Sequence, residues 1–251
     1  MRLINPAHDA VAGISRLSLS FSGTPEEVRE VQSLRYEVFI EEAGLSGLAN
    51  QRRIDQDEFD DYCDHLIVRD AQTLKVVGTY RVLGPSGAQR CGRFYSEQEF
   101  DLVRLRHLRA RIVEAGRACI HPDYRGGGVL MLLWAGLAQY MKREQCDYLI
   151  GCASIGLEDG GHNAKAIYHE LNGKHLAPAE YRVTPHVPYP VGSSENGGGA
   201  PRIPPLLKGY LRSGAWICGE PAWDANFHCA DLFMLLSLER MESRYARHYK
   251  K

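Results

Sequence analysis

The stretch IVEAGRACIHPDYRGGGVLMLLWAGL, residues 112–137, decides the fold. It begins as a strand, passes through a proline and three consecutive glycines, and continues as a purely apolar helix. The segment CDYLIGCAS, residues 146–154, then returns to strand character. A strand, a glycine turn, a helix and a second strand make a βαβ unit, so the sequence predicts an α/β domain.

The segments around this unit supply further elements. Thr24 is suited to cap a helix that starts at Pro25 and stops at Gly44. Residues 96–111 are expected to be helical or looped. Other expected elements are an antiparallel hairpin (64–70 and 75–83), a helix ending at Gly173 (163–173) and two late strands (214–219 and 230–238).

The chain is expected to form one domain. It has no internal repeat, and most of its expected connections are short. Residues 185–205 are rich in Pro, Gly and Ser and predict a long loop. We therefore expect an N-terminal extension, residues 1–22, followed by a single domain over residues 23–251.

Composition excludes several classes of protein. The formal net charge of -1 argues against a general nucleic-acid binder, which needs a basic surface. No apolar run is long enough to cross a bilayer, and the N-terminus lacks a secretory signal, so a cytoplasmic location is expected. Seven cysteines without paired spacing suggest reduced thiols. His121, His162 and His169 do not have the spacing of metal ligands, so no metal site is expected.

The glycine turn allows two interpretations. The backbone N–H groups of Gly126, Gly127 and Gly128 precede a helix whose dipole favours anions, and Arg125 adds a cation. These features suit a phosphate cradle, but a tight turn without a ligand has the same glycines.

The strand before the turn carries an acid and a base, Glu114 and Arg117. In strict alternation an odd separation places them on opposite faces of a sheet. Gly116 suggests a β-bulge that would bring both side chains to one cleft. The alternative is a salt bridge at the rim of the sheet.

The turn resembles the acyl-thioester-binding motif R/Q-x-x-G-x-G/A of the GNAT superfamily, whose turn amides hold the pyrophosphate of coenzyme A. Leu130 stands where that motif has a small residue. This departure favours a donor with one phosphate, the phosphopantetheine arm of acyl carrier protein, over acyl-CoA.

Four further motifs occur in one order: R-x-x-x-F, D-x-x-D, G-x-x-R and E-x-x-R. In this order they resemble the acyl-homoserine-lactone synthases and N-acyl amino acid synthases, and most closely the acyl-ACP-dependent ornithine N-acyltransferases. The resemblance extends through GRFYSEQEFDL, LLWAGL, IGCAS and PPLLKGYLRSGAW and covers about residues 30–235. The residues that match the four motifs are Arg35, Phe39, Asp57, Asp60, Arg81, Glu114 and Arg117.

The resemblance implies a GNAT fold, with a mixed, twisted sheet splayed by a bulge and flanked by helices. It implies transfer of a (3-hydroxy)acyl chain from acyl carrier protein to the α-amine of ornithine, giving lyso-ornithine lipid, without a metal or redox cofactor. An amine must lose a proton before it attacks, and Glu114 is the best candidate for the base. Arg117 would order the site with Arg81, and Tyr168 resembles the tyrosine that protonates the leaving thiolate, although helical aromatics are usually core residues. The substrate-binding candidates are Arg35, Phe39, Asp57, Asp60 and Arg81, where the aspartates either hold a cationic amino acid or orient the arginines.

One stretch, RLRHLRAR, is strongly basic. It would suit an acidic acyl carrier protein or an anionic inner-membrane surface, and a solvated face is the other interpretation. The tail RYARHYKK, residues 244–251, is open to the same interpretations. The four basic side chains of the first stretch are Arg104, Arg106, Arg109 and Arg111.

Three rival functions stay open. A homoserine-lactone synthase would use S-adenosylmethionine as acceptor, although the chain continues further past residue 205 than those synthases do. An N-acyltransferase could instead use another amino acid, such as glycine or tyrosine. A protein that binds acyl carrier protein or a membrane without catalysis would not need an acid beside a thioester.

Overall fold

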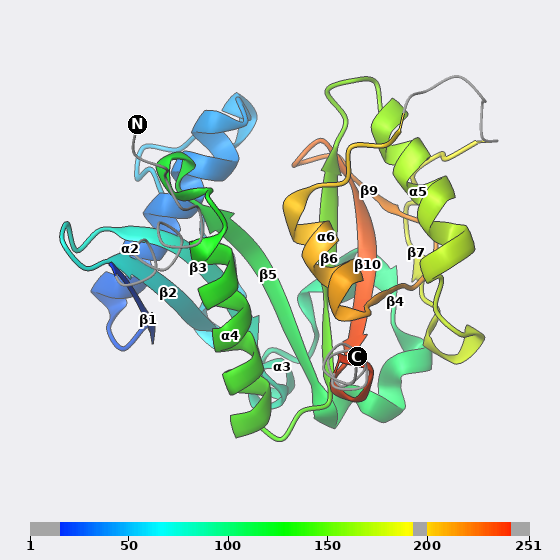
Figure 1. The fold of residues 1–251 in the computed structure, drawn as a ribbon, viewed down its shortest axis with the longest axis horizontal. Helices are drawn as coiled ribbons and strands as arrows, with labels where there is room; N and C mark the ends of the chain where they lie inside the picture. The colour runs from blue at the N-terminus through cyan, green and yellow to red at the C-terminus, as the bar shows by residue number, and fades with distance from the viewer. Residues whose placement is uncertain (1–15, 193–199, 242–251) are drawn as a thin grey trace, which may run out of the picture. The chain divides into compact units, whose positions relative to one another are not determined.

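The computed structural model describes residues 16–192 and 200–241 of the chain (Figure 1). Most of the predicted extension, the centre of the predicted loop and the basic tail lie outside these residues. The strands are β1 (Leu17–Phe21), β2 (Asp64–Asp70), β3 (Val76–Leu83), β4 (Phe100–Asp101), β5 (Ile112–Ile120), β6 (Tyr148–Gly156), β7 (Thr184–Pro185), β8 (Trp216–Ile217), β9 (Ala222–Asp224) and β10 (Cys229–Ser237).

The helices include α-, 3-10 and π-helical segments. The α-helices are α2 (Pro25–Tyr36), α3 (Pro85–Cys91), α4 (Gly128–Arg143), α5 (His162–His175) and α6 (Pro205–Ser213). The π-helix is η1 (Glu37–Glu42). The 3-10 segments are η2 (Ser46–Leu48), η3 (Asp60–Tyr62), η4 (Tyr95–Gln98), η5 (Val103–Arg111), η6 (Pro122–Tyr124) and η7 (Ala179–Tyr181).

The chain divides into two compact units. The first contains the described residues up to Arg90 together with Ala115–Glu144. The second contains Cys91–Glu114 and the described residues from Gln145 onward. The division falls inside β5, so the first three residues of this strand belong to one unit and the rest to the other.

The sheet of the first unit is antiparallel through β1, β2 and β3, and the later part of β5 follows β3. The predicted hairpin is confirmed, with Leu74 at a positive φ of 59° in its turn. Strand β1 lies within the segment predicted as an extension and pairs along its whole length with β2. Its residues LSLSF alternate between apolar and polar, so the sequence carried a period-two strand signal that the prediction of an extension overlooked.

The helix predicted from Pro25 to Gly44 is confirmed, because α2 continues directly into η1 and Gly44 follows with a φ of 70°. The Thr24 side chain accepts a hydrogen bond from the Glu27 N–H at 3.3 Å, and Pro25 takes the first position. The Glu27 carboxylate accepts from the Gly23 N–H at 2.7 Å, so the capping box closes one residue earlier than its usual form. From Glu37 the helix widens into η1, and π-helical turns of this kind are frequent at functional sites.

Helix α4 lies very close to the sheet of the first unit (Figure 1). A Cβ added at Gly78 in β3 would overlap the Val129 side chain, and one at Gly136 in α4 would lie 2.6 Å from Leu66 Cδ2. Gly78 is the glycine of the G-x-x-R motif. Close packing of strand against helix is therefore a sufficient physical reason for a glycine at this position.

We expect Gly78→Ala to lower the free energy of unfolding by about 1–3 kcal/mol, the usual range for overpacking a core. The added methyl group meets Val129, whose branched side chain has one preferred rotamer and cannot easily move aside. Urea denaturation measures the effect. Combining the change with Val129→Ala should recover part of the loss, and an equal loss with and without Val129→Ala would contradict this explanation.

The sheet of the second unit contains the parallel pair that the βαβ pattern predicts. Ile112, Val113 and Glu114 of β5 pair with Tyr148, Leu149 and Ile150 of β6. Strand β6 is antiparallel to β10, and β10 also pairs with β8 and β9. All nine residues of β10 are buried, as expected for a strand covered on both faces.

Helix α5 continues through Gly173 to His175, so the predicted stop at Gly173 is wrong. After the helix the chain becomes extended, and the Ala177 N–H bonds to the Ile217 carbonyl at 2.8 Å. The pairing with β8, rather than the local effect of a glycine, decides where the helix ends. Gly173 is tolerated because it lies at an exposed position in the last turn.

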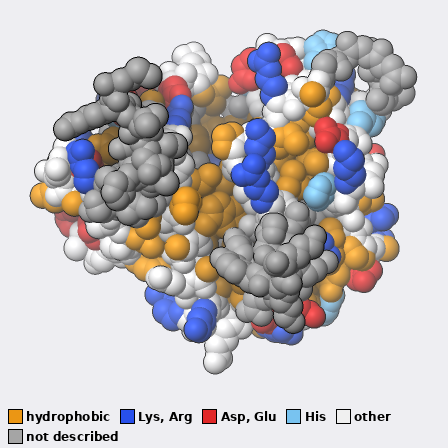
Figure 2. Space-filling model, in the orientation of Figure 1, with side chains coloured by type: hydrophobic (Ala, Val, Ile, Leu, Met, Phe, Trp, Pro, Cys, Tyr) orange, Lys and Arg blue, Asp and Glu red, His pale blue; other side chains and the backbone are white. Residues whose placement is uncertain are grey.

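Helix α6 was not predicted, although its sequence carries both boundary signals. Pro205 occupies the first turn, and Gly214 follows the last turn with a φ of 97°. Leu207, Tyr210 and Leu211 form the buried side. The opposite side is basic, and a basic side chain is visible over α6 in Figure 2.

Candidate active site

Glu114 is held rigidly within the second unit. Pairing with Ile150 fixes its backbone in β5. Its carboxylate accepts hydrogen bonds from the Tyr95 N–H at 2.5 Å, the Ser96 N–H at 2.9 Å and the Ser96 hydroxyl. The residue is only 4% exposed. Three donors around a buried carboxylate favour its ionised form and fix its orientation.

Strand β5 is irregular at Arg117, which has a positive φ of 51°. This conformation costs a non-glycine residue about 1–2 kcal/mol. The sequence predicted an irregularity at Gly116, and the structure places it one residue later. Strict alternation therefore does not apply across this strand. Glu114 and Arg117 belong to different units, and the convergence of their side chains stays a prediction.

In the first unit, three arginines and three aspartates alternate in one network. Arg35, on α2, donates to Asp55 at 2.6 Å and to both oxygens of Asp60 at 2.5 and 3.3 Å. Arg81, on β3, donates to Asp57 Oδ1 at 2.5 Å and to Asp60 Oδ1 at 3.5 Å. Arg117 forms ion pairs at 3.4 Å with Asp55 and Asp57. The network joins the first, second, third and fourth motifs of the sequence.

The network is deeply buried. Arg35 is 0% exposed, and Asp60 and Arg81 are nearly as inaccessible. Burial alone would raise the pKa of Asp60, but the Arg35 guanidinium outweighs burial and holds the pKa below its usual range. Burial would likewise lower the pKa of Arg81, and Asp57 reverses the direction. Asp60 and Arg81 are therefore charged at neutral pH, and each needs its partners.

The aspartates were expected either to hold a cationic amino acid or to orient the arginines. The geometry matches the second alternative. The Asp60 carboxylate also accepts from the Asp57 N–H at 2.9 Å. Asp61 is exposed and Asp64 accepts from the Tyr140 hydroxyl at 2.8 Å, so neither belongs to the network. Asp55 was missed, although its spacing of two residues from Asp57 in DQDEFDD was a visible signal.

Two further residues lie at the edges of the network. His65 is 1% exposed, with Nε2 at 3.9 Å from Asp60 Oδ1. Among the described residues neither ring nitrogen has a hydrogen-bond partner, and burial lowers the pKa of this histidine, so the ring is neutral. Phe39 lies half-buried in η1, one turn after Arg35. The sequence singled out Phe39 by motif, whereas no pattern indicated His65.

The glycine turn leads into α4 as predicted. Gly127 caps the helix with a φ of 99°, and no side chain caps the first turn. A Cβ at Gly126 or Gly127 would meet nothing within 4 Å, so the backbone here is open to an approaching group. Arg125 does not stand free beside the turn, because it donates to both oxygens of Glu42 at 2.6 Å. These bonds lower the pKa of Glu42.

Tyr168 lies on the packed side of α5 and is 8% exposed. Burial raises the pKa of its hydroxyl above the ordinary value of 10.0. A thiolate is a weaker base than tyrosinate, so this hydroxyl would give up its proton to a thiolate only with difficulty. The position agrees best with a core residue.

The second unit also contains a pair of neighbouring acids, half-buried Glu99 and buried Asp231, that no sequence pattern indicated. Burial, together with the Asp231 carboxyl, raises the pKa of Glu99 from 4.5 to about 9. Burial raises the pKa of Asp231 as well. Among the described residues Glu99 Oε2 is buried without a donor, as expected for a carboxyl that keeps its own proton at neutral pH.

Around this pair, two groups of three carboxyl and thiol side chains share Asp231 and have the ligand atoms that a metal site would need. Within each group the candidate ligand atoms lie within 4.8 Å of one another. Burial raises the pKa of both cysteine thiols, and protonated thiols are poor metal ligands. None of the seven cysteines forms a disulfide, in agreement with reduced thiols. The two groups are Glu99, Cys152 and Asp231, and Asp224, Cys229 and Asp231.

The raised pKa of Glu99 predicts a pH-dependent stability. Between pH 4.5 and about pH 9 the folded chain binds a proton at Glu99 that the unfolded chain lacks. Stability therefore falls as pH rises through this window, by up to about 1.4 kcal/mol per pH unit. Glu99→Gln should remove this slope and raise the melting temperature at pH 8. Exposed Glu180→Gln is the control, and equal slopes in all three proteins would contradict the assignment.

The basic stretch forms η5, and three of its arginines are engaged within the second unit. Arg109 donates to both oxygens of Glu97 at 2.9 Å, and Arg104 donates to the Ala179 carbonyl at 2.6 Å. Arg111 pairs with Asp147. Of the four arginines in η5, Arg106 alone has no ion pair or hydrogen bond among the described residues. The segment is thus in large part a structural one.

No helix in the described part of the chain is long and apolar enough to cross a membrane.

Residues 34–135 match the family described as Acetyltransferase (GNAT) domain. The solved structure of FeeM, an N-acyl amino acid synthase from uncultured soil microbes, covers 91% of this chain and 94% of its own, with a TM-score of 0.55 and 11% identity. The AHL synthase LasI covers 88% of this chain and 90% of its own, with a TM-score of 0.53 and 13% identity. At these identities the two structures show a shared fold alone, and the predicted GNAT fold is confirmed.

Relatives with higher identity are proteins named L-ornithine N(alpha)-acyltransferase. The relative from Brucella abortus (strain 2308) is 33% identical over 94% of this chain and 89% of its own length. The relative from Rhodobacter capsulatus is also 33% identical, over 90% of this chain and 92% of its own. With this similarity along nearly its whole length, the chain belongs to the family of L-ornithine N(alpha)-acyltransferases.

Proposed function

We propose that this protein transfers an acyl chain from acyl carrier protein to the α-amine of L-ornithine, giving lyso-ornithine lipid. One observation carries the proposal: relatives with this named activity are 33% identical over 90% or more of the chain. The reaction needs no redox cofactor, because amide formation from a thioester is a transfer without a change in oxidation state, and the proposal includes no metal.

The reaction requires a free amine. The α-ammonium of ornithine first loses a proton, which Glu114 accepts directly or through water in this proposal. The amine nitrogen then attacks the thioester carbonyl, and the C–N bond forms. The nitrogen loses its second proton to solvent, the C–S bond breaks, and the pantetheine thiolate leaves and takes up a proton from solvent. Glu114 suits the first step because its three donors hold the carboxylate in one orientation.

The choice of ornithine over glycine or tyrosine rests on the named relatives. Glu114, Glu99 and Asp231 lie near enough to one another that Glu114 contributes to the raised pKa of Glu99. Because Glu99 keeps its own proton at neutral pH, this group of acids does not by itself attract a second ammonium charge. In the first unit the Arg35, Arg81 and Arg117 network provides a rigid support for the motif residues.

The proposed donor site is the glycine turn. The uncapped first turn of α4 offers N–H groups to a phosphate, and the open space at Gly126 and Gly127 allows close approach. Leu130, where a small residue would accompany coenzyme A, supports a phosphopantetheine arm with one phosphate. The exposed Arg106 and the basic side of α6 are the candidates for contact with an acidic carrier protein or an anionic membrane.

The proposal is tested by incubating the protein with 3-hydroxyacyl carrier protein and a panel of acceptors. The panel contains ornithine, glycine, tyrosine and S-adenosylmethionine, and free thiol and product mass are followed. We expect thiol release and an N-acyl product with ornithine. Release with another acceptor alone would reassign the substrate, and no release with any acceptor would leave a binding protein. Replacing the carrier protein by acyl-CoA tests the donor in the same assay.

A further inference from the structure

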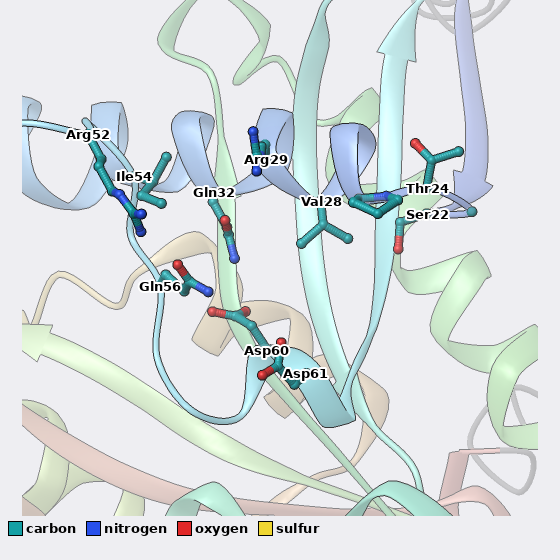
Figure 3. A pocket seen from close by; sticks show the side chains of 12 residues that line it. Ser22, Thr24, Val28, Arg29, Gln32, Arg52, Ile54, Gln56, Asp60 and Asp61 are labelled. Atoms are coloured by element: carbon teal, nitrogen blue, oxygen red, sulfur yellow. The ribbon is translucent and has the colours of Figure 1, made fainter.

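The first unit contains a pocket that the proposed reaction does not use. Its volume is about 730 Å³, and it lies between α2, the end of β1 and the loop that precedes β2 (Figure 3). In this view Gln32 points from α2 toward Asp60 and Gln56 on the facing loop, and Arg52 extends toward Gln56. A pocket of this size is within the usual range for small-molecule sites.

Gln32 indicates that the pocket is built for a polar ligand. The residue is 3% exposed, and its backbone carbonyl accepts from the Asp55 N–H at 3.0 Å. Its side-chain amide, however, has no hydrogen-bond partner among the described residues and is directed into the pocket (Figure 3). The amide is reached by solvent in the pocket, so a ligand that enters can replace water with a direct hydrogen bond to it.

The charges around the pocket require a ligand with groups of both signs. Arg29 and Arg52 are exposed at the pocket, and within the described residues neither guanidinium forms an ion pair. Asp61 also lines the pocket; its carboxylate is exposed and has no ion-pair or hydrogen-bond partner among the described residues. Asp60 also lines the pocket, but Arg35 binds both of its oxygens. The unpaired groups are thus two cations, one anion and one neutral amide.

From this arrangement we infer that the pocket binds a small zwitterion, with a carboxylate facing Arg29 and Arg52 and an ammonium group facing Asp61 and the Gln32 amide oxygen. The bidentate match of guanidinium and carboxylate gives the anionic end its orientation. The Gln32 amide accepts from the ammonium group, as a carboxylate would, without adding a buried charge. The inference does not depend on the proposed reaction, since it concerns binding alone.

Three probes with the same five-carbon chain test separately whether binding needs the carboxylate, the ammonium group or both. 5-Aminopentanoate carries both charges and has no α-amine, so it cannot serve as the proposed acceptor. Pentanoate keeps only the carboxylate, and pentylamine keeps only the ammonium group. Calorimetry with the full chain and no acyl donor should give a dissociation constant of about 1 mM or below for 5-aminopentanoate. Binding of either single-charge probe should be at least about tenfold weaker, one unit in log Kd.

Two variants assign the binding to the pocket. Gln32→Leu has nearly the same volume and removes the amide, so it should weaken binding about tenfold. Arg29→Ala combined with Arg52→Ala changes only exposed side chains, and it should weaken binding further without affecting folding. Arg90→Ala, which removes an exposed charge of the same unit outside the pocket, is the matched control and should bind like the wild type.

The inference is overturned if the wild type binds none of the three probes, or if both variants bind 5-aminopentanoate as tightly as the wild type. Equal binding of pentanoate and 5-aminopentanoate would also overturn it, because the pocket would then select an anion only. A failure of the acyl-transfer assay changes none of these outcomes, so the two proposals stand or fall separately.

Discussion

Replacing Glu114 by Gln is expected to slow acyl transfer to ornithine by about two to four orders of magnitude, the usual contribution of a positioned base. The variant keeps the shape of the side chain but loses the negative charge that would accept the ammonium proton. Initial rates of thiol release from acyl carrier protein measure the effect. The wild-type rate should also rise with pH, because a larger fraction of ornithine then carries a free α-amine that can attack.

The control for Glu114→Gln must separate catalysis from folding. The new amide would face the N–H groups of Tyr95 and Ser96, so the substitution also disturbs three hydrogen bonds. Ser96→Ala removes one of these donors and leaves the carboxylate in place. It should lower the melting temperature with a change in rate of less than about tenfold. An unchanged rate in a folded Glu114→Gln variant would remove Glu114 from the proposed mechanism.

The largest expected loss of stability follows from breaking the network in the first unit. Asp60→Ala leaves the Arg35 and Arg81 guanidiniums buried without one of their counter-charges. Removing one partner of a buried ion pair costs about 3–5 kcal/mol, and the free energy of unfolding should fall by that amount. Urea denaturation followed by circular dichroism gives the value.

An exposed pair provides the comparison. Arg53 lies 2.8 Å from Glu41, with 69% and 36% of the two side chains exposed. Arg53→Ala should therefore change stability by less than about 1 kcal/mol. Combining Asp60→Leu with Arg35→Met removes a buried pair together and should be less harmful than Asp60→Ala alone. If Asp60→Ala costs no more than Arg53→Ala, the network does not support the fold.

The sequence by itself determined the elements whose signals are local. The βαβ unit, the hairpin of β2 and β3 and the start of α2 follow from apolar periodicity, turn residues and a capping side chain, which act between residues close in the chain. The seven motif residues were singled out by their resemblance to the family's motifs, and the structure brings five of them into one network. Asp55 was not predicted, because it contacts arginines that lie far away in the sequence.

The tertiary structure decided the features that depend on distant neighbours. Pairing with β8 ends α5 beyond Gly173. Burial among other acids, rather than residue type, raises the pKa of Glu99. Periodicity and spacing report which side of an element is apolar. They do not report which polar groups from distant segments share that side, because burial and electrostatic interactions are set by three-dimensional proximity.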